Sequence, residues 1–222
     1  MLVLEIALDK HKIDTNPEKN SWLHRAGQSL AEALRLAACQ ELDIEFTELV
    51  TGYRVRQGFE NDFIDLYLYD SLSSGAGYAV SIEASIQSLL QKTRELLSGC
   101  KCDTACYQCL KHYRNQYYHG FLDRWAALQL LNWAEKNARV PALSADKQKL
   151  LLHPLGQILK LSGVKLIDEG DKVFVEGTHA RKVIGVYPAM WRRPVADDTI
   201  FISDTQLKYA KPFALKTIVE SL

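Results

Sequence analysis

Alternating apolar and polar residues predict strands in the first part of the chain. Residues 2–8 alternate from the second position onward, and residues 62–69 place two leucines and Ile64 on one face. A period of two residues is that of a strand with one buried face. Residues 43–56 predict one bent strand or a hairpin, because β-branched and aromatic side chains are frequent there. We therefore expect a small sheet, antiparallel or mixed.

Apolar residues at helical spacing predict helices that would pack on this sheet. The first runs over residues 22–40, and Ser21 is suited to cap its amino end. The second runs over residues 78–98 and carries isoleucine and leucine on one stripe. The third covers residues 124–137, where Asp123 can cap the first turn. Helices together with a small sheet predict an α+β fold.

The character of the chain changes near Val140 and Pro141, where residues 139–148 form a candidate linker. The sequence therefore predicts two domains, over residues 1–138 and 139–222. The second is the smaller and would be an α/β domain, whose role the sequence does not assign. Its expected elements are helices at about 146–162 and 211–221 and strands at 164–167, 172–176, 182–187 and 199–203.

Composition is that of an ordinary globular protein. The 222 residues are 47% hydrophobic and 24% charged, and 27 basic residues balance 27 acidic ones. No overall field attracts nucleic acid, so any such binding must come from a local patch. The amino end lacks a signal-peptide pattern, and no apolar window approaches the ~20 residues of a membrane span. These features predict a cytoplasmic protein, in which clustered cysteines are more often metal ligands or redox groups than disulfides.

Four of the five cysteines fall within ten residues, in the pattern C-x-C-x3-C-x2-C. They are Cys100, Cys102, Cys106 and Cys109. Four thiolates without a histidine favour a closed, structural zinc site, since no position is left for water. An iron–sulfur cluster, two disulfides, a redox C-x2-C or a site without metal stay open as alternatives. The fifth, Cys39, lies at a helix end, where a small buried side chain is the expected role.

A basic and aromatic stretch, residues 110–124, follows the cysteines. Its candidate nucleic-acid contacts are Lys111, His112, Tyr113, Arg114, Tyr117 and Arg124. Cationic groups suit phosphates, and aromatic rings can stack on bases. In the alternative interpretation, the tyrosines pack the cysteine loop onto the body and the arginines form internal ion pairs. His112 could also be a spare metal ligand, although a surface or phosphate-contacting histidine is the favoured interpretation.

A glycine loop lies between the strand at 62–69 and the helix that follows it. It contains Ser74, Gly75 and Gly77, and backbone N–H groups at a helix start favour an anion. The loop is not a Walker motif, and no such motif occurs in the chain. A tight turn that lets the helix pack on the sheet is the favoured alternative. Asp70 is placed to bond the backbone of this loop.

The order of these features resembles a known module. YDSLSSGAGY, an amphipathic helix, C-x-C-x3-C-x2-C and LDR at a helix start together resemble the MrfA-like zinc-binding domain, over roughly residues 22–137. That domain lies at the C-terminus of large DEAD/DEAH-box superfamily 2 helicases, which serve DNA repair and anti-phage systems such as DISARM and Druantia. The family usually has glycine where Ser74 stands and Gly-Cys-Pro-x-Cys where this chain has ACYQC.

The resemblance implies that the four clustered cysteines are Zn²⁺ ligands and that the chain works with helicase motor domains. Those domains would lie upstream or on another chain, which would explain a sequence that begins within a strand pattern. We therefore expect a non-catalytic accessory domain that supports DNA binding or docks to the motor. The alternatives are a protein-interaction scaffold without DNA binding and a nuclease-like C-terminal domain built on Glu169, Asp171 and Glu176 near Lys172.

Overall fold

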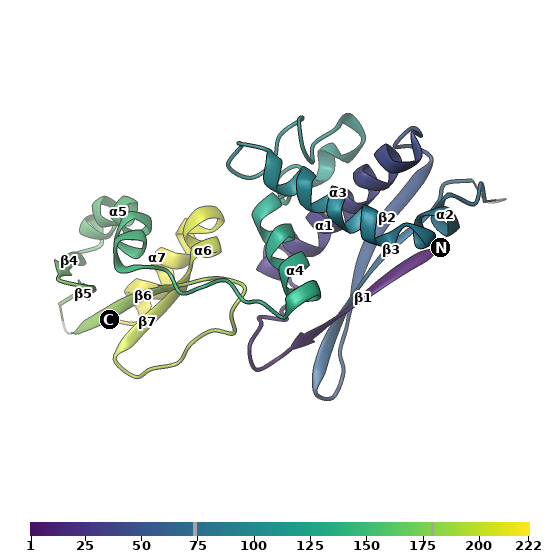
Figure 1. The fold of residues 1–222 in the computed structure, drawn as a ribbon. Helices are drawn as coiled ribbons and strands as arrows, with labels where there is room; N and C mark the ends of the chain where they lie inside the picture. The colour runs from purple at the N-terminus through teal and green to yellow at the C-terminus, as the bar shows by residue number, and fades with distance from the viewer. Residues whose placement is uncertain (73–74, 179) are drawn as a thin grey trace. The chain divides into compact units, whose positions relative to one another are not determined.

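A computed structural model describes residues 1–72, 75–178 and 180–222 of the chain. It contains two compact units, Met1–Arg139 and Val140–Leu222, each with its own sheet and helices (Figure 1). This is the α+β architecture that the sequence predicts. Within the described residues, no helix is long and apolar enough to cross a membrane.

The first unit is built on a three-stranded antiparallel sheet with the order β1-β3-β2. Its strands are β1 (Leu2–Asp9), β2 (Leu49–Arg56) and β3 (Asn61–Asp70). The strand predictions at 2–8 and 62–69 are confirmed. The expected strand or hairpin at 43–56 is wrong in its first part, because Asp43 adopts a left-handed conformation and the strand begins only at Leu49.

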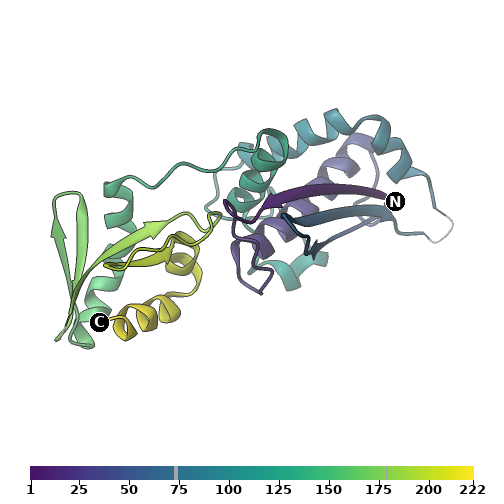
Figure 2. The ribbon, with the colours of Figure 1, turned by 90° about the horizontal axis from the view of Figure 1, so that it is seen from below.

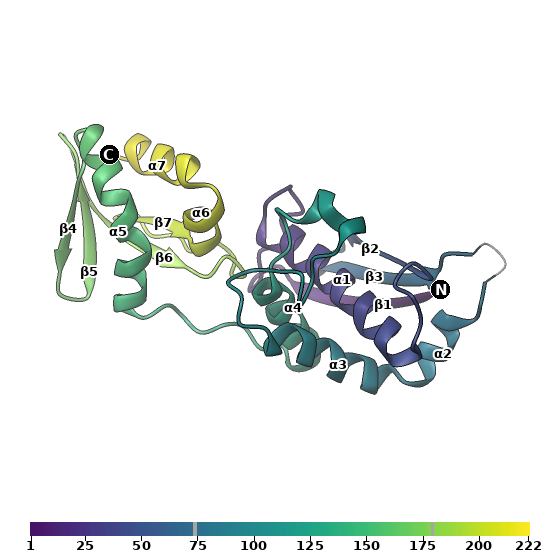
Figure 3. The same ribbon diagram turned by 90° about the horizontal axis from the view of Figure 1, so that it is seen from above.

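One long helix, α1 (Trp22–Leu42), covers one face of this sheet (Figure 3). It begins as predicted, with the Ser21 hydroxyl accepting a hydrogen bond from the His24 N–H at 3.1 Å. Gly27 lets helix and sheet approach closely, because a Cβ atom there would stand 2.8 Å from side-chain atoms of Ile64 and Tyr53. The strands lie in front of α1 when the unit is seen from below (Figure 2).

The helix expected at 78–98 is divided in two at Ser85, giving α2 (Tyr78–Ala84) and α3 (Ile86–Gly99). Both the N–H and the hydroxyl of Ser85 bond the Ile82 carbonyl, at 3.0 and 3.4 Å. A serine side chain that competes for backbone partners in this way disfavours continuation of a helix.

Two further elements follow the cysteines. A short 3₁₀ helix, η1 (Tyr113–Tyr118), was not predicted. Helix α4 (Arg124–Lys136) is the helix expected at 124–137. The Asp123 carboxylate caps it, accepting from the N–H groups of Trp125 and Ala126 at 2.9 and 3.3 Å. Helices α3 and α4 both pack against α1, and this places the cysteine loop at one end of the helical layer.

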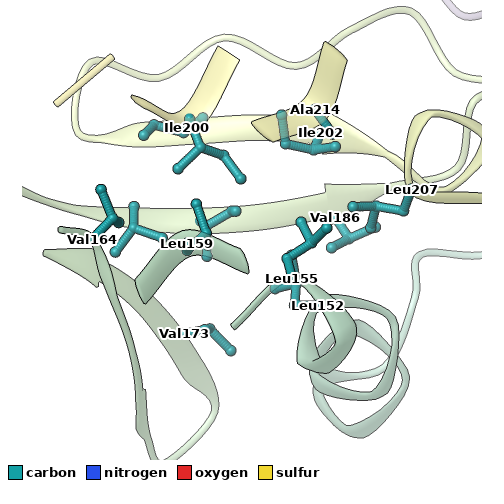
Figure 4. Packing of buried hydrophobic residues seen from close by; sticks show 13 residues of the cluster. Leu152, Leu155, Leu159, Val164, Val173, Val186, Ile200, Ile202, Leu207 and Ala214 are labelled. Atoms are coloured by element: carbon teal, nitrogen blue, oxygen red, sulfur yellow. The ribbon is translucent and has the colours of Figure 1, made fainter. Parts of the chain in front are cut away.

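The second unit contains a mixed four-stranded sheet with the order β4-β5-β6-β7. In this sheet only β6 and β7 pair in parallel. Leucines of one helix and aliphatic residues of the strands and the last two helices fill its core (Figure 4). Its helices and strands agree with those expected, except that the second helix was missed although Ser203 and Gln206 form a capping box. The elements are α5 (Ala145–Leu161), β4 (Lys165–Glu169), β5 (Lys172–Glu176), β6 (Arg181–Tyr187), β7 (Thr199–Ser203), α6 (Asp204–Tyr209) and α7 (Lys211–Glu220).

Candidate metal centre and its surroundings

The four clustered cysteines bring their sulfur atoms together at the end of α3. Every pair of these atoms lies within 4.8 Å, and three of the separations are 3.5 Å for Cys100–Cys106, 3.7 Å for Cys102–Cys109 and 3.9 Å for Cys106–Cys109. The C-x2-C turn is closed by its own backbone, because the Cys106 carbonyl accepts the N–H groups of Cys109 and Leu110 at 3.1 and 3.2 Å. The sequence pattern therefore folds into one compact cluster of thiols.

These separations fit a tetrahedron around a single ion. Zn–S bonds of about 2.3 Å imply sulfur–sulfur distances of about 3.8 Å. Disulfide sulfurs would stand only about 2.0 Å apart, so the thiols are not bonded to one another. An iron–sulfur cluster has to fit several irons and sulfides between its ligands and would hold the cysteine sulfurs farther apart. The donor set thus fits the Zn²⁺ of a structural site.

Backbone N–H groups aimed at sulfur support thiolate ligands. The Cys106 N–H donates to Cys109 Sγ at 3.2 Å, and the Gln108 N–H donates to Cys106 Sγ at 3.4 Å. The Cys102 backbone N–H, with further thiol contacts, lowers the pKa of Cys100 to about 7. Burial raises the pKa of Cys102 to about 12 and also raises that of Cys109. Binding of a metal must therefore displace protons from the cluster.

Arg124 fastens the cysteine loop to the helices, which corrects its prediction as a nucleic-acid contact. Its side chain is only 3% exposed. Its Nε donates to the Cys102 carbonyl at 2.9 Å, and its Nη1 donates to the Leu97 carbonyl at 3.0 Å. The guanidinium also lies 3.9 Å from the ring centroid of Trp125. A guanidinium that is buried and bonds two backbone carbonyls faces the protein interior and not a phosphate at the surface.

His112 also faces inward, so its predicted role as a phosphate contact is corrected as well. Its Nε2 lies 2.6 Å from Arg35 Nη2 and 3.2 Å from Glu32 Oε2, and its ring is 4.8 Å from that of Phe46. Burial is the largest influence on its pKa and lowers it, which favours the neutral ring at pH 7. Among the described residues, the metal-ligand group contains the four cysteines and not His112.

Among the remaining candidates, Tyr113, Arg114 and Tyr117 face solvent. Tyr113 and Tyr117 are 78% and 82% exposed, Arg114 is exposed, and Lys111 is half-buried. Sequence reasoning missed Tyr107, which is 74% exposed within the C-x2-C turn itself, with its ring 5.6 Å from that of His119. The sequence did carry a signal for this exposure, because Tyr107 lies between two metal ligands. A side chain at such a position must point away from the ion.

In the described part of the glycine loop and the helix start after it, the N–H groups of Gly75, Gly77 and Ala79 bond acceptors of the protein itself. The Asp70 carboxylate accepts from the N–H groups of Gly77 and Ala79, at 2.8 and 3.0 Å, which confirms that Asp70 bonds this loop. Although burial opposes it, these backbone bonds lower the pKa of Asp70 and keep it ionised. Gly75 and Gly77 have positive φ of 67° and 82°, as a tight turn requires, while Ser74 lies outside the described residues. The described part of the loop has the conformation that the tight-turn interpretation expects.

The acidic residues of the second unit do not converge. Glu169 pairs with Arg181, and Asp168 pairs with Lys149 at 2.7 Å. Across residues 1–72, 75–178 and 180–222, the cysteine cluster is the only group of three or more His, Cys, Asp or Glu side chains placed to hold a metal. The nuclease interpretation of Glu169, Asp171 and Glu176 therefore gains no support.

Comparisons with known proteins match several parts of this chain. Residues 30–110 match the family model described as the MrfA Zn-binding domain. The Druantia protein DruE of Escherichia coli is 38% identical over 173 residues, covering 75% of this chain but 9% of DruE. An uncharacterized protein of Methanocaldococcus jannaschii is 29% identical over 85 residues, which make up 37% of this chain and 76% of that protein. The match to the crystal structure of the DUF1998 helicase MrfA bound to DNA covers 50% of this chain and 14% of the MrfA chain, with 17% identity and a TM-score of 0.39.

Proposed function

Because residues 30–110 match the model of the MrfA Zn-binding domain, we propose that the chain is a non-catalytic accessory part of a larger helicase and supports its binding of nucleic acid. The chain itself has no Walker motif, so ATP hydrolysis would belong to motor domains elsewhere. Zn²⁺ held by Cys100, Cys102, Cys106 and Cys109 supplies a cross-link that fixes the loop between α3 and α4. The protein's own contribution is the surface that this loop presents.

The observation that carries the proposal is the exposure of three tyrosines on and beside the metal loop. Tyr107, Tyr113 and Tyr117 are each at least 74% exposed, although tyrosine is a residue that normally buries much of its ring. An aromatic ring exposed to solvent offers a base a surface to stack on, worth roughly 1–3 kcal/mol per base. The tyrosines stand on a segment with little apolar core of its own, so their positions depend on the metal.

Charge on this surface is modest. A Zn²⁺ ion with four thiolates carries a formal charge of about −2. Lys101, Lys111 and Arg114 lie in the same part of the chain and offset that charge. Stacking should therefore contribute more to affinity than phosphate contacts, and a single strand with unstacked bases is the expected ligand. Salt should weaken binding, but with a shallow slope.

The test is fluorescence anisotropy with a labelled single-stranded oligothymidine and the zinc-loaded chain. Replacing both Tyr113 and Tyr117 by alanine should weaken binding about tenfold or more. Replacing Lys111 and Arg114 by alanine should weaken it less and flatten its salt dependence. The matched control is Tyr69→Ala, which removes a 38% exposed tyrosine from β3 and should change nothing. Equal loss in the control, or no binding by the wild-type chain, would reject the proposal.

The same experiment distinguishes the proposed nucleic-acid role from the main alternative, a protein-interaction scaffold. A scaffold that joins motor domains to another subunit would bind them stably and would not bind the oligonucleotide at all. As to the pathway, the 38% identity with a Druantia protein favours phage defence over DNA repair. We propose defence as the setting, and loss of protection against phage in cells carrying the Cys106→Ser variant of the full system would be the corresponding observation.

A further inference from the structure

We propose that His112 positions part of the tyrosine surface, the surface formed by Tyr107, Tyr113 and Tyr117, and that it does so separately from the metal. A buried ion pair of α1 holds His112, and His112 in turn holds Tyr113 and Tyr117 where they can stack on bases. It is a positioning residue and does not touch nucleic acid itself. The consequence for binding rests on the function proposed above, whereas the support of the two tyrosines can be measured without any ligand.

The ion pair is formed by Glu32 and Arg35, which lie one turn apart on α1. Glu32 Oε2 and Arg35 Nη2 are 2.6 Å apart, and the two side chains are only 6% and 12% exposed. Burying two charges costs desolvation free energy that their attraction only partly returns, so the pair contributes little stability by itself. Its geometry, however, fixes a strong hydrogen-bond donor in one place at the surface of α1.

His112 uses that donor. Its Nε2 lies 2.6 Å from Arg35 Nη2, and its side chain is 14% exposed. A guanidinium can only donate, so Nε2 accepts the hydrogen bond and the ring is neutral. The ring of Phe46 packs on the imidazole at 4.8 Å between centroids. His112 is therefore held by a hydrogen bond from α1 and by a ring contact, and both come from residues far away in the chain.

The segment that carries the tyrosines is tied to His112. The His112 N–H donates to Asn115 Oδ1 at 2.9 Å, and Asn115 Nδ2 donates to the Leu110 carbonyl at 2.8 Å. His119 Nε2 lies 2.9 Å from the same Oδ1 atom and 3.1 Å from the His112 carbonyl. Asn115 is 2% exposed and joins the residues before and after η1. A displacement of His112 therefore moves η1, with Tyr113 and Tyr117, as one piece.

The metal supports a different part of the same loop. Tyr107 stands in the C-x2-C turn, where the Cys106 carbonyl accepts the N–H groups of Cys109 and Leu110. This turn is closed by its own backbone and by the ligands of the ion, and not by α1. Loss of the His112 contact should therefore loosen η1 and leave the C-x2-C turn intact.

The first experiment is hydrogen exchange of the backbone amides in the zinc-loaded chain, followed by two-dimensional NMR. His112→Leu removes the acceptor but leaves Glu32 and Arg35 paired, so no buried charge loses its partner. We expect the Asn115 amide, which bonds the His112 carbonyl at 3.2 Å, to exchange about fivefold faster or more, and the Cys109 amide to change by less than about twofold. His112→Gln places an amide oxygen near Arg35 and should restore slow exchange. His153→Leu, at an exposed histidine of α5, is the control.

The second experiment measures the binding of labelled oligothymidine by these variants. His112→Leu should weaken it about fivefold at unchanged zinc content, and His112→Gln should restore it. Unchanged exchange at Asn115 in His112→Leu, equally faster exchange at Cys109, or no rescue by glutamine would overturn the proposal. If the wild type does not bind oligothymidine, the function proposed above fails, and the exchange rates still decide whether His112 positions η1.

Discussion

Arg124, at the start of α4, donates a hydrogen bond from its Nε to the Cys102 carbonyl at 2.9 Å. The two residues stand 22 positions apart, and the bond joins the metal loop directly to the helical layer. A second bond at 3.0 Å from the same guanidinium to Leu97 ties in the end of α3. The metal site is thus supported from outside by one buried cation, as well as by its own turn.

Replacing Arg124 by alanine should therefore loosen the metal site. Loss of two charge-assisted hydrogen bonds to buried carbonyls is expected to cost about 2–3 kcal/mol in the free energy of unfolding. Zinc should also leave faster, which a colorimetric chelator can follow in stopped-flow or manual mixing. Arg114→Ala is the matched control, since Arg114 is exposed and its removal should change stability by less than about 0.5 kcal/mol. Equal effects of the two variants would show that Arg124 does not support the loop.

Removal of zinc should affect one unit of the chain and spare the other. About one zinc per chain is expected by elemental analysis, and Cys106→Ser should lose it. In calorimetry, the zinc-loaded protein should give a transition for the first unit that chelation shifts to lower temperature, because the loop between α3 and α4 depends on the metal. The second unit has a separate hydrophobic core and should melt unchanged. Iron in place of zinc, or a Cys106→Ser variant with unchanged metal content and melting, would contradict the assignment.

The ion pairs of Asp65 lead to a prediction about the stability of the protein at acidic pH. Its side chain is 3% exposed on the open face of the sheet, where it accepts from Arg56 Nε at 2.7 Å and Arg54 Nε at 2.8 Å. The Arg56 bond is the largest cause that holds its pKa below the ordinary 3.8. A lowered carboxylate pKa stabilises the folded state above the unfolded value and loses that effect as pH falls through the folded value.

The difference in stability between the wild type and Asp65→Asn should therefore be constant near neutral pH and shrink below about pH 4. Urea unfolding of both proteins at a series of pH values measures it. Zinc release in acid affects both proteins alike, so the difference isolates Asp65. Glu60→Gln, at an exposed position in the β2–β3 turn, is the control and should show no such trend. A difference that stays constant down to pH 3 would show that the arginines do not stabilise this carboxylate.

Local signals in the sequence were enough for most of the fold. Ser21 and Asp123 mark helix starts by side-chain oxygens that accept nearby N–H groups, and both caps are present. Alternation at residues 62–69 placed Ile64 on the buried face. The cysteine spacing likewise indicated a single cluster, because two sulfurs of a C-x2-C turn can reach one ion. Each of these features depends on residues that are near one another in the chain.

The features that the sequence did not predict depend on contacts between residues far apart in the chain. Arg124 and His112 were expected to face nucleic acid, and a guanidinium or imidazole can serve an internal bond or a ligand equally well. The structure turns them inward because their partners, Leu97 for Arg124 and Glu32 for His112, come from other helices. The partner of His112 is 80 positions away, and no local pattern reports such a contact. The sequence named Tyr113 and Tyr117 as candidates, and the packing adds that both of them and Tyr107 are exposed.

Cys39 should be chemically inert in the folded chain. It is 5% exposed, its thiol lies 3.7 Å from the Glu45 carbonyl, and burial raises its pKa to about 11. Since the thiolate is the reactive form, little of it exists at neutral pH. We expect a maleimide to leave Cys39 unmodified in the native zinc-loaded protein at pH 7 and to modify it after unfolding in guanidinium, as peptide mass spectrometry would detect. Cys39→Ala should melt slightly lower but retain its zinc. Modification of Cys39 in the native protein at a rate similar to that of the unfolded chain would show that the end of α1 opens to solvent.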